Sequence, residues 1–137
     1  MPFTVSVDAA RRRVLAVRTG DGRLDEIYAS IDAVIDHPDY QPGFDILFDL
    51  REAEYLAEGQ EALAVARFLA ARRDRIPGRI ALVPPAIHRL AIAARYLAVV
   101  DTHVGLEVQS FPTPAAALAW FDAPAGRAAP PNVTPPA

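Results

Sequence analysis

A strand-and-helix unit recurs along most of this chain, and that repetition constrains the fold more than any other feature. Apolar patterning predicts three strands, each preceded by a glycine and followed by a helix. The strand and helix of each unit are expected at residues 44–49 and 58–75, 79–83 and 87–101, and 106–111 and 113–121. Strands that alternate with helices at this spacing are joined by right-handed crossovers, so they lie parallel.

An amino-terminal hairpin precedes these units. Apolar and polar residues alternate over residues 3–8, and a second strand is expected at residues 13–19. A helical pattern then starts at Leu24 and stops before His37 and Pro38. The chain is therefore predicted to be an α/β protein with a mixed five-stranded sheet and about four helices. A single domain is expected over residues 1–123, followed by a proline-rich tail over residues 124–137.

The residue types present exclude much of enzyme chemistry. The chain has no cysteine, and all 14 of its basic residues are arginines, so thiol nucleophiles, Schiff bases and a P-loop lysine are excluded. His37, His88 and His103 lack the short spacing of a helical zinc site. Asp45 and Asp49 share a strand face but lie about 13 Å apart, too far for paired-carboxylate catalysis. No catalytic residue, metal ligand or cofactor is predicted, and we expect a protein that is not an enzyme.

Charge is unevenly distributed along the chain. The net charge of -3 argues against a nucleic-acid partner. Residues 24–61 carry eleven acidic side chains and one arginine, whereas residues 62–95 carry seven arginines and one aspartate. This predicts an electrostatically two-sided molecule, whose charged faces are either simply solvated or dock a charged partner or a second copy. The start of the chain does not resemble a signal peptide, and the apolar stretch at residues 90–100 is too short for a membrane span, so a cytoplasmic location is expected.

A ligand site is expected where the parallel strands end. Ligands of such sheets collect beyond the carboxyl ends of the strands. Arginine and histidine side chains there, next to the start of a helix, are suited to a phosphate or carboxylate group. The candidate ligand-binding residues are Asp49, Arg51, His88 and Arg89. The alternative is that Asp49 caps the following loop and that the arginines are solvated or paired with Glu52 and Glu54.

Three stretches carry a resemblance to a known family. They are the third strand with its acidic end (residues 44–51), the strand at residues 80–83 with the helix after it, and the closing segment at residues 111–121. Over residues 3–121 the chain resembles the SpoIIAA-like family, which is related to STAS domains. The resemblance implies a right-handed (βα)n superhelix with roughly sequential strands, and a protein that binds partners or apolar ligands rather than catalysing a reaction.

One departure from that family bears on function. Anti-sigma-factor antagonists of this group carry a switching serine after the third strand, where phosphorylation adds about two negative charges. The matching segment here, residues 50–59, contains no serine or threonine, and Tyr55 is its only hydroxyl. The expected function is a non-catalytic binding or regulatory module without the phosphoserine switch, acting through protein–protein interaction. The alternative, suggested by a distant likeness to CRAL-TRIO lipid-binding domains, is a carrier of a small apolar or lipid-like ligand with an anionic head group.

A homodimer is also expected, from the strand faces. Apolar residues occur on both faces of two strands, which is typical of strands covered on both sides: they are Phe44, Ile46, Leu47 and Phe48 in one strand and residues 80–83 in the next. Sequential strands with right-handed crossovers place every connecting helix on one side of the sheet, leaving the other side bare. A second copy of the chain is the preferred cover. The tail, a ligand or a reversed strand order are the alternatives.

Overall fold

The computed structural model describes residues 3–57, 59–76, 78–85 and 107–123. Three of the expected features lie outside the described residues: the helix at residues 87–101, the candidate ligand-binding residues His88 and Arg89, and the tail at residues 124–137.

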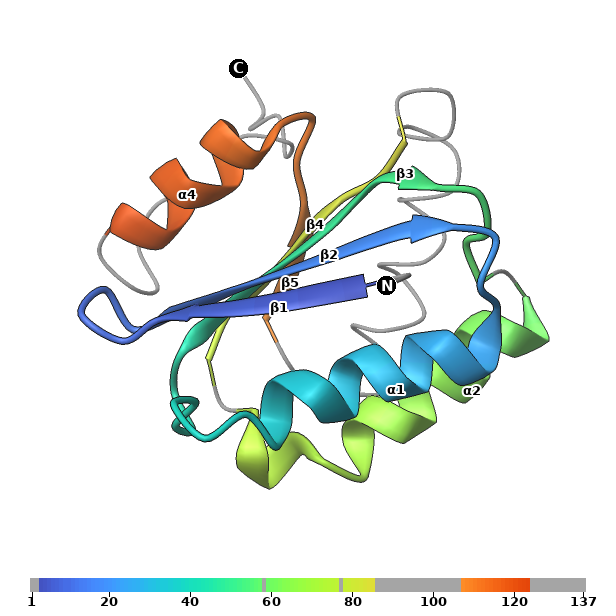
Figure 1. The fold of residues 1–137 in the computed structure, drawn as a ribbon, viewed down its shortest axis with the longest axis horizontal. Helices are drawn as coiled ribbons and strands as arrows, with labels where there is room; N and C mark the ends of the chain where they lie inside the picture. Colours follow the sequence, from blue (N-terminus) through green and yellow to red (C-terminus); the bar gives the residue numbers. More distant parts are fainter. Residues whose placement is uncertain (1–2, 58, 77, 86–106, 124–137) are drawn as a thin grey trace, which may run out of the picture.

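A mixed five-stranded sheet forms the centre of the fold (Figure 1). Its strands are β1 (Phe3–Asp8), β2 (Arg13–Gly20), β3 (Asp45–Ala53), β4 (Ile80–Val83) and β5 (Val108–Ser110). They lie in sequential order, with β1 antiparallel to β2 and every other neighbouring pair parallel. The α/β class, the hairpin and the mixed sheet predicted from the sequence are confirmed.

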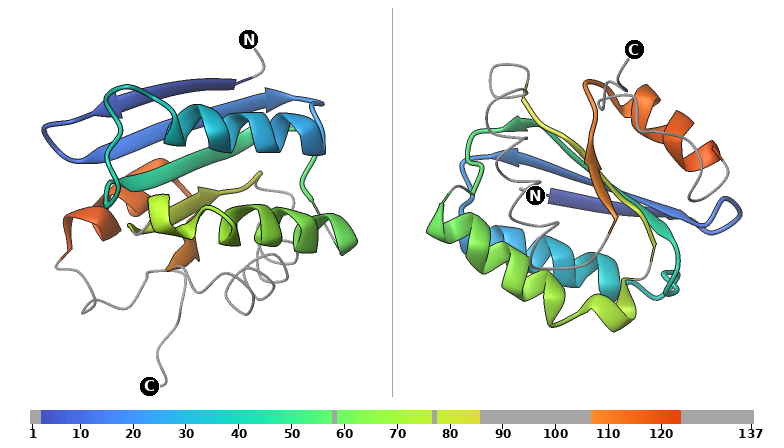
Figure 2. Two further views of the ribbon diagram at one scale, coloured as in Figure 1. Left: turned by 90° about the horizontal axis from the view of Figure 1, so that it is seen from below. Right: turned by 180° about the vertical axis from the view of Figure 1, so that it is seen from behind.

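The helices lie on both faces of this sheet. The described helices are α1 (Leu24–Ile35), α2 (Gln60–Ala70), the 3-10 turn η1 (Arg73–Arg75) and α4 (Pro114–Asp122). Helices α1 and α2 lie side by side on one face, and α4 lies on the other (Figures 1 and 2). The expectation of a bare second face is therefore wrong. Helix α4 follows the last strand instead of connecting two strands, so crossover handedness does not determine its side.

Two hydrophobic clusters correspond to the two faces. The larger lies between the sheet and α1 and α2, and includes Ile31, Val65 and Ile80. The smaller lies under α4, where Trp120 and Phe121 pack on strand residues that include Leu47 and Val83. Strand β4 is apolar on both faces because each face has its own cluster, and β3 contributes Ile46 to the larger cluster and Leu47 to the smaller one.

The largest differences from the expected element boundaries are at the ends of β3 and α2. Strand β3 continues to Ala53 instead of ending at Asp49, because β2 stays paired with it through Thr19 and Glu52 after an irregularity in register. Helix α2 ends at Ala70, after which the chain tightens into η1. The start of α4 is as expected, since the Thr113 hydroxyl accepts a hydrogen bond from the Ala116 backbone N–H at 3.1 Å.

The acidic and the basic stretch of the sequence pair with each other. Three ion pairs join them: Arg72 with Asp32 at 2.8 Å, Arg75 with Asp36 at 3.0 Å, and Arg79 with Asp45 at 3.0 Å. The first two connect the end of α2 and η1 to α1, and the third lies inside the molecule. These three arginines therefore form ion pairs within the protein, which weakens the argument that they bind a charged partner.

Candidate functional site

A cavity lies between the sheet and the pair of helices α1 and α2. Eleven of its thirteen described lining residues are apolar, and the other two are Arg18 and Ser30. The apolar lining includes Ile27, Ile31, Phe48, Leu69, Ile80 and Leu82. Its volume is about 60 Å³, which is room for about four water-sized groups. An apolar cavity of this kind is suited to part of a small organic molecule rather than to a cluster of water.

Arg18 is the charged residue of this lining. Val14, Ala16 and Arg18 alternate along β2 with residues that face α4, so all three point toward α1 and α2. Arg18 is only 4% exposed. Its Nη1 donates to the Gly22 carbonyl at 3.1 Å and its Nη2 to the Tyr55 carbonyl at 2.8 Å. These bonds fix the guanidinium near the ends of β2 and β3.

Ser30 is the other polar residue of the lining. Its hydroxyl donates to the Ile27 carbonyl of the same helix at 2.8 Å. The bond satisfies the hydroxyl within α1, which is common for serine in a helix. Both polar residues of the described lining are thus hydrogen-bonded within the fold.

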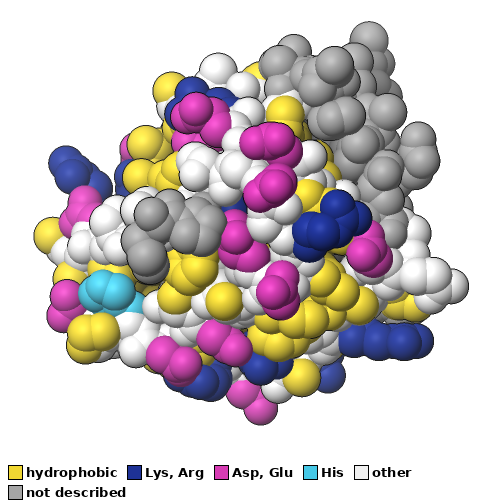
Figure 3. Space-filling model, turned by 45° about the vertical axis from the view of Figure 1, so that its right-hand side comes forward, with side chains coloured by type: hydrophobic (Ala, Val, Ile, Leu, Met, Phe, Trp, Pro, Cys, Tyr) yellow, Lys and Arg dark blue, Asp and Glu magenta, His cyan; other side chains and the backbone are white. Residues whose placement is uncertain are grey.

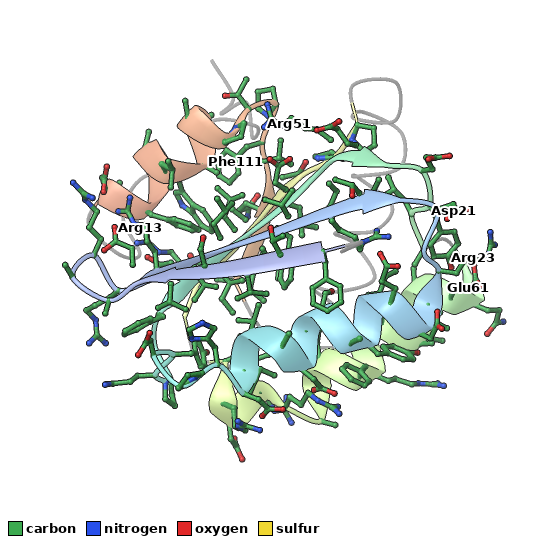
Figure 4. The ribbon with its side chains drawn as sticks, viewed as in Figure 1. Arg13, Asp21, Arg23, Arg51, Glu61 and Phe111 are labelled. Carbon is green, nitrogen blue, oxygen red and sulfur yellow. The ribbon has the colours of Figure 1, made fainter. Side chains whose placement is uncertain are left out.

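Further charged and aromatic residues surround the Arg18 end of the cavity. The Arg23 guanidinium lies over the Tyr55 ring, 4.3 Å from its centroid. Burial, together with the neighbouring Glu61 carboxylate, raises the pKa of Tyr55 to about 12, so its phenol stays protonated at neutral pH. Figure 4 shows Arg23 and Glu61 together where α1 and α2 begin. On this side of the molecule, acidic and basic side chains are interspersed with hydrophobic patches (Figure 3).

The ligand-binding residues expected from the sequence are only partly brought together. Asp49 and Arg51 meet in a two-point ion pair, with Arg51 Nε 2.9 Å from Asp49 Oδ1 and Nη2 2.8 Å from Oδ2. Asp49 follows Leu47 on the strand face that α4 covers, and Figure 4 shows Arg51 on that side near Phe111. The pair therefore lies on the opposite side of the sheet from the cavity. The alternative that Asp49 caps the next residues of the chain agrees with the hydrogen bond from the Arg51 backbone N–H to Asp49 Oδ1 at 3.2 Å.

The expected edge of the sheet is nonetheless part of the cavity. Pro84, which follows β4, and Leu56, which follows β3, both line it at the carboxyl ends of their strands. Sequence reasoning located this edge but missed Arg18. The signal that could have found it is the alternation along β2. Every second residue from Val14 through Ala16 faces the core, and the next in this series is Arg18.

Tyr55 is expected to remain unphosphorylated in the folded protein. It is 8% exposed and its ring is covered by Arg23, so a kinase could reach the hydroxyl only after local unfolding. The native and the denatured chain are incubated with cell extract and ATP, and the phosphopeptides are mapped. The denatured chain shows whether the extract contains a kinase for this sequence. Stoichiometric phosphate on Tyr55 of the native chain would contradict the prediction.

The described residues form neither a metal site nor a membrane-spanning helix. Among the described residues, no group of three or more histidine, aspartate or glutamate side chains is placed to hold a metal ion. Within the same residues, no helix has the length and apolar character needed to cross a membrane. Comparison with known proteins finds no matching family model, no matching curated protein and no matching solved structure.

Proposed function

We propose that this chain is a non-catalytic binding protein for a small apolar molecule, which it holds in the cavity between the sheet and helices α1 and α2. The observation that carries the proposal is the cavity itself, with its apolar lining and one buried arginine. Pockets that bind small molecules combine a mostly apolar wall with a few placed polar groups.

The strand order supports the more specific fold. A sequential order with parallel pairing from β2 to β5 is the arrangement that the SpoIIAA-like resemblance implies, so we propose a SpoIIAA-like (βα)n superhelix over residues 1–123. A regulatory role through a protein partner, a homodimer and a cytoplasmic location remain predictions. Two observations favour the ligand carrier over the interaction module. The first is the apolar cavity. The second is that three arginines that could bind a charged partner form ion pairs within the protein.

The proposal is tested by filling the cavity. Ser30→Leu replaces a hydroxyl that bonds only to its own helix with a branched apolar side chain directed into the cavity. Isothermal titration calorimetry with hexanoic acid and with hexanol is expected to show binding of at least one of them to the unmodified chain. Affinity should fall at least tenfold in Ser30→Leu, while the melting temperature stays unchanged or rises, as is usual for cavity filling.

The matched control makes the same change outside the cavity. Ser6 is exposed on β1, so Ser6→Leu should bind both probes as the unmodified chain does. Native mass spectrometry of the purified protein adds a search for a molecule already bound. The proposal fails if neither probe binds, or if Ser30→Leu binds as tightly as Ser6→Leu.

A further inference from the structure

We infer that two copies of this chain form a dimer by antiparallel pairing of their β1 strands about a two-fold axis at Val5, which joins the two sheets into one. The described residues that line the cavity include none from β1, so the inference does not depend on the proposed function. It is supported by the open edge of β1, the residue pattern of that strand, the position of α1 and the distribution of charge.

Strand β1 forms one edge of the sheet (Figure 2). Among the described residues it pairs with β2 and with no other strand, so alternate backbone N–H and C=O groups point away from the sheet. Edge strands are usually protected by proline, lysine, a bulge or a very short length. Strand β1 has none of these, since its six residues pair with β2 in unbroken register and its one charged residue is Asp8, at its end. The opposite edge strand, β5, has only three residues.

The residue pattern of β1 identifies a second copy as the partner that fits this edge. Around a two-fold axis perpendicular to the sheet, directly opposite residues point to the same face, so the axis passes through a residue position. An axis at Val5 places Phe3 opposite Val7 of the second copy, and Thr4 opposite Ser6. An aromatic residue opposite a β-branched one, and a hydroxyl opposite a hydroxyl, are both favourable cross-strand pairs. The strand is therefore complementary to itself.

The position of α1 allows this pairing and extends the contact. Helix α1 packs over β1 and β2, on the face to which Val5 and Val7 point. Neighbouring strands are about 4.8 Å apart, so the axis would place the second α1 about 10 Å from the first, close to the usual distance between packed helices. Ala33 lies on the side of α1 turned away from α2, because it comes five residues after Tyr28, which stacks on Phe68 of α2. Its small side chain permits the close approach.

The same axis keeps like charges apart. The charged residues nearest to the interface are at the hairpin end of β1, where Asp8 forms an ion pair with Arg11. Antiparallel pairing directs the hairpins of the two copies to opposite ends of the interface. Asp8 is three residues from the axis, so the two Asp8 residues would be about 20 Å apart along the strands. The dimer therefore forms without opposing carboxylates.

The oligomeric state is measured by size-exclusion chromatography with light scattering at micromolar concentrations. The unmodified chain should elute with twice its monomer mass of 14.8 kDa. A monomer mass that stays constant when the sample is concentrated would overturn the inference and leave the proposed function standing.

Two double variants test the surface and the register together. Thr4 and Ser6 are exposed, so substitutions there leave the core intact, which circular dichroism verifies. Thr4→Lys with Ser6→Lys places like charges opposite each other twice, so the dissociation constant should rise at least about tenfold. Thr4→Glu with Ser6→Lys places opposite charges at the same positions, so the constant should stay within about threefold. Dissociation of both variants would overturn the axis at Val5, and dimers of both would overturn the assignment to β1.

The matched control adds a charge at the other edge of the sheet. The register places one row of residues on the face that α4 covers, from β1 to β5: Ser6, Leu15, Leu47, Ala81 and Gln109. Gln109→Lys therefore introduces a lysine in the same row and on the same face as Ser6→Lys, and should leave the dimer intact. A monomeric Gln109→Lys variant would place the interface at β5 and overturn the inference.

Discussion

Arg79→Ala is expected to detach α4 from the sheet and to lower the free energy of unfolding by about 3–5 kcal/mol, the range for breaking a buried ion pair. The side chains of Arg79 and Asp45 are only 12% and 17% exposed. Arg79 Nη1 also donates to the Trp120 carbonyl at 2.8 Å, and Nη2 to the Phe121 carbonyl at 2.7 Å. The substitution removes the cation from the part-buried Asp45 carboxylate, which keeps only the hydrogen bond from the backbone N–H of residue 79 among its bonds to that residue. It also removes the cation from the end of α4, where helix carbonyls are otherwise unsatisfied.

The effect is measured through the single tryptophan. Trp120 is 4% exposed and packs against Phe111, with ring centroids 5.2 Å apart, so its emission reports whether α4 is docked. Urea titration of Arg79→Ala should give a lower midpoint, and native emission should be shifted to longer wavelength. Arg75→Ala is the matched control, because the Arg75–Asp36 pair is more than half exposed and should contribute about 1 kcal/mol or less. Similar midpoints for the two variants would contradict the prediction.

The sheet could be predicted because its signals are local. Alternation in β1 and β2, the apolar runs of β3 and β4, and the glycine before each later strand determine the strands without knowledge of distant contacts. The preference for right-handed crossovers then places the helices that connect parallel strands on one side of the sheet when the strands are in sequential order. The side taken by α4 could not be predicted in this way, since it depends on Trp120 and Phe121 packing against Leu47 and Val83 from far along the chain.

The site was harder to predict for a related reason. The ends of parallel strands indicated an edge of the sheet, and Pro84 does lie in the cavity at that edge. The face, however, depends on strand parity. Asp49 and Leu50 are neighbours in sequence, yet Leu50 lines the cavity while Asp49 faces the α4 side with Arg51. A charged residue near a strand end therefore predicts a site only when the alternation of side chains along the strand also shows which face of the sheet it lies on. Arg18 is an example, because it lies on the same face as Val14 and Ala16.

The glycines that precede the strands have a steric role in addition to marking turns. Gly43, before β3, has φ +101°, a backbone conformation that disfavours residues with a side chain. Gly78, before β4, lies against the same segment. A methyl group on Gly78 would overlap the Phe44 carbonyl oxygen and come within 3.0 Å of the Gly43 carbonyl oxygen. Both obstacles are backbone atoms, so no side chain can rotate away to make room.

Gly78→Ala is therefore expected to lower the free energy of unfolding by about 3 kcal/mol, the upper end of the usual range for overpacking. The cost arises because the chain must move where β4 joins β3, next to the hydrogen bond from the Ile46 N–H to the Arg79 carbonyl at 2.9 Å. Gly22→Ala is the matched control, since the three atoms nearest to a methyl group there all belong to the end of the Glu26 side chain, which can rotate away, so the change should cost less than about 1 kcal/mol. Urea unfolding followed by circular dichroism measures both variants. Equal stability of the two would show that the approach of Gly78 to Phe44 does not constrain the β3–β4 junction.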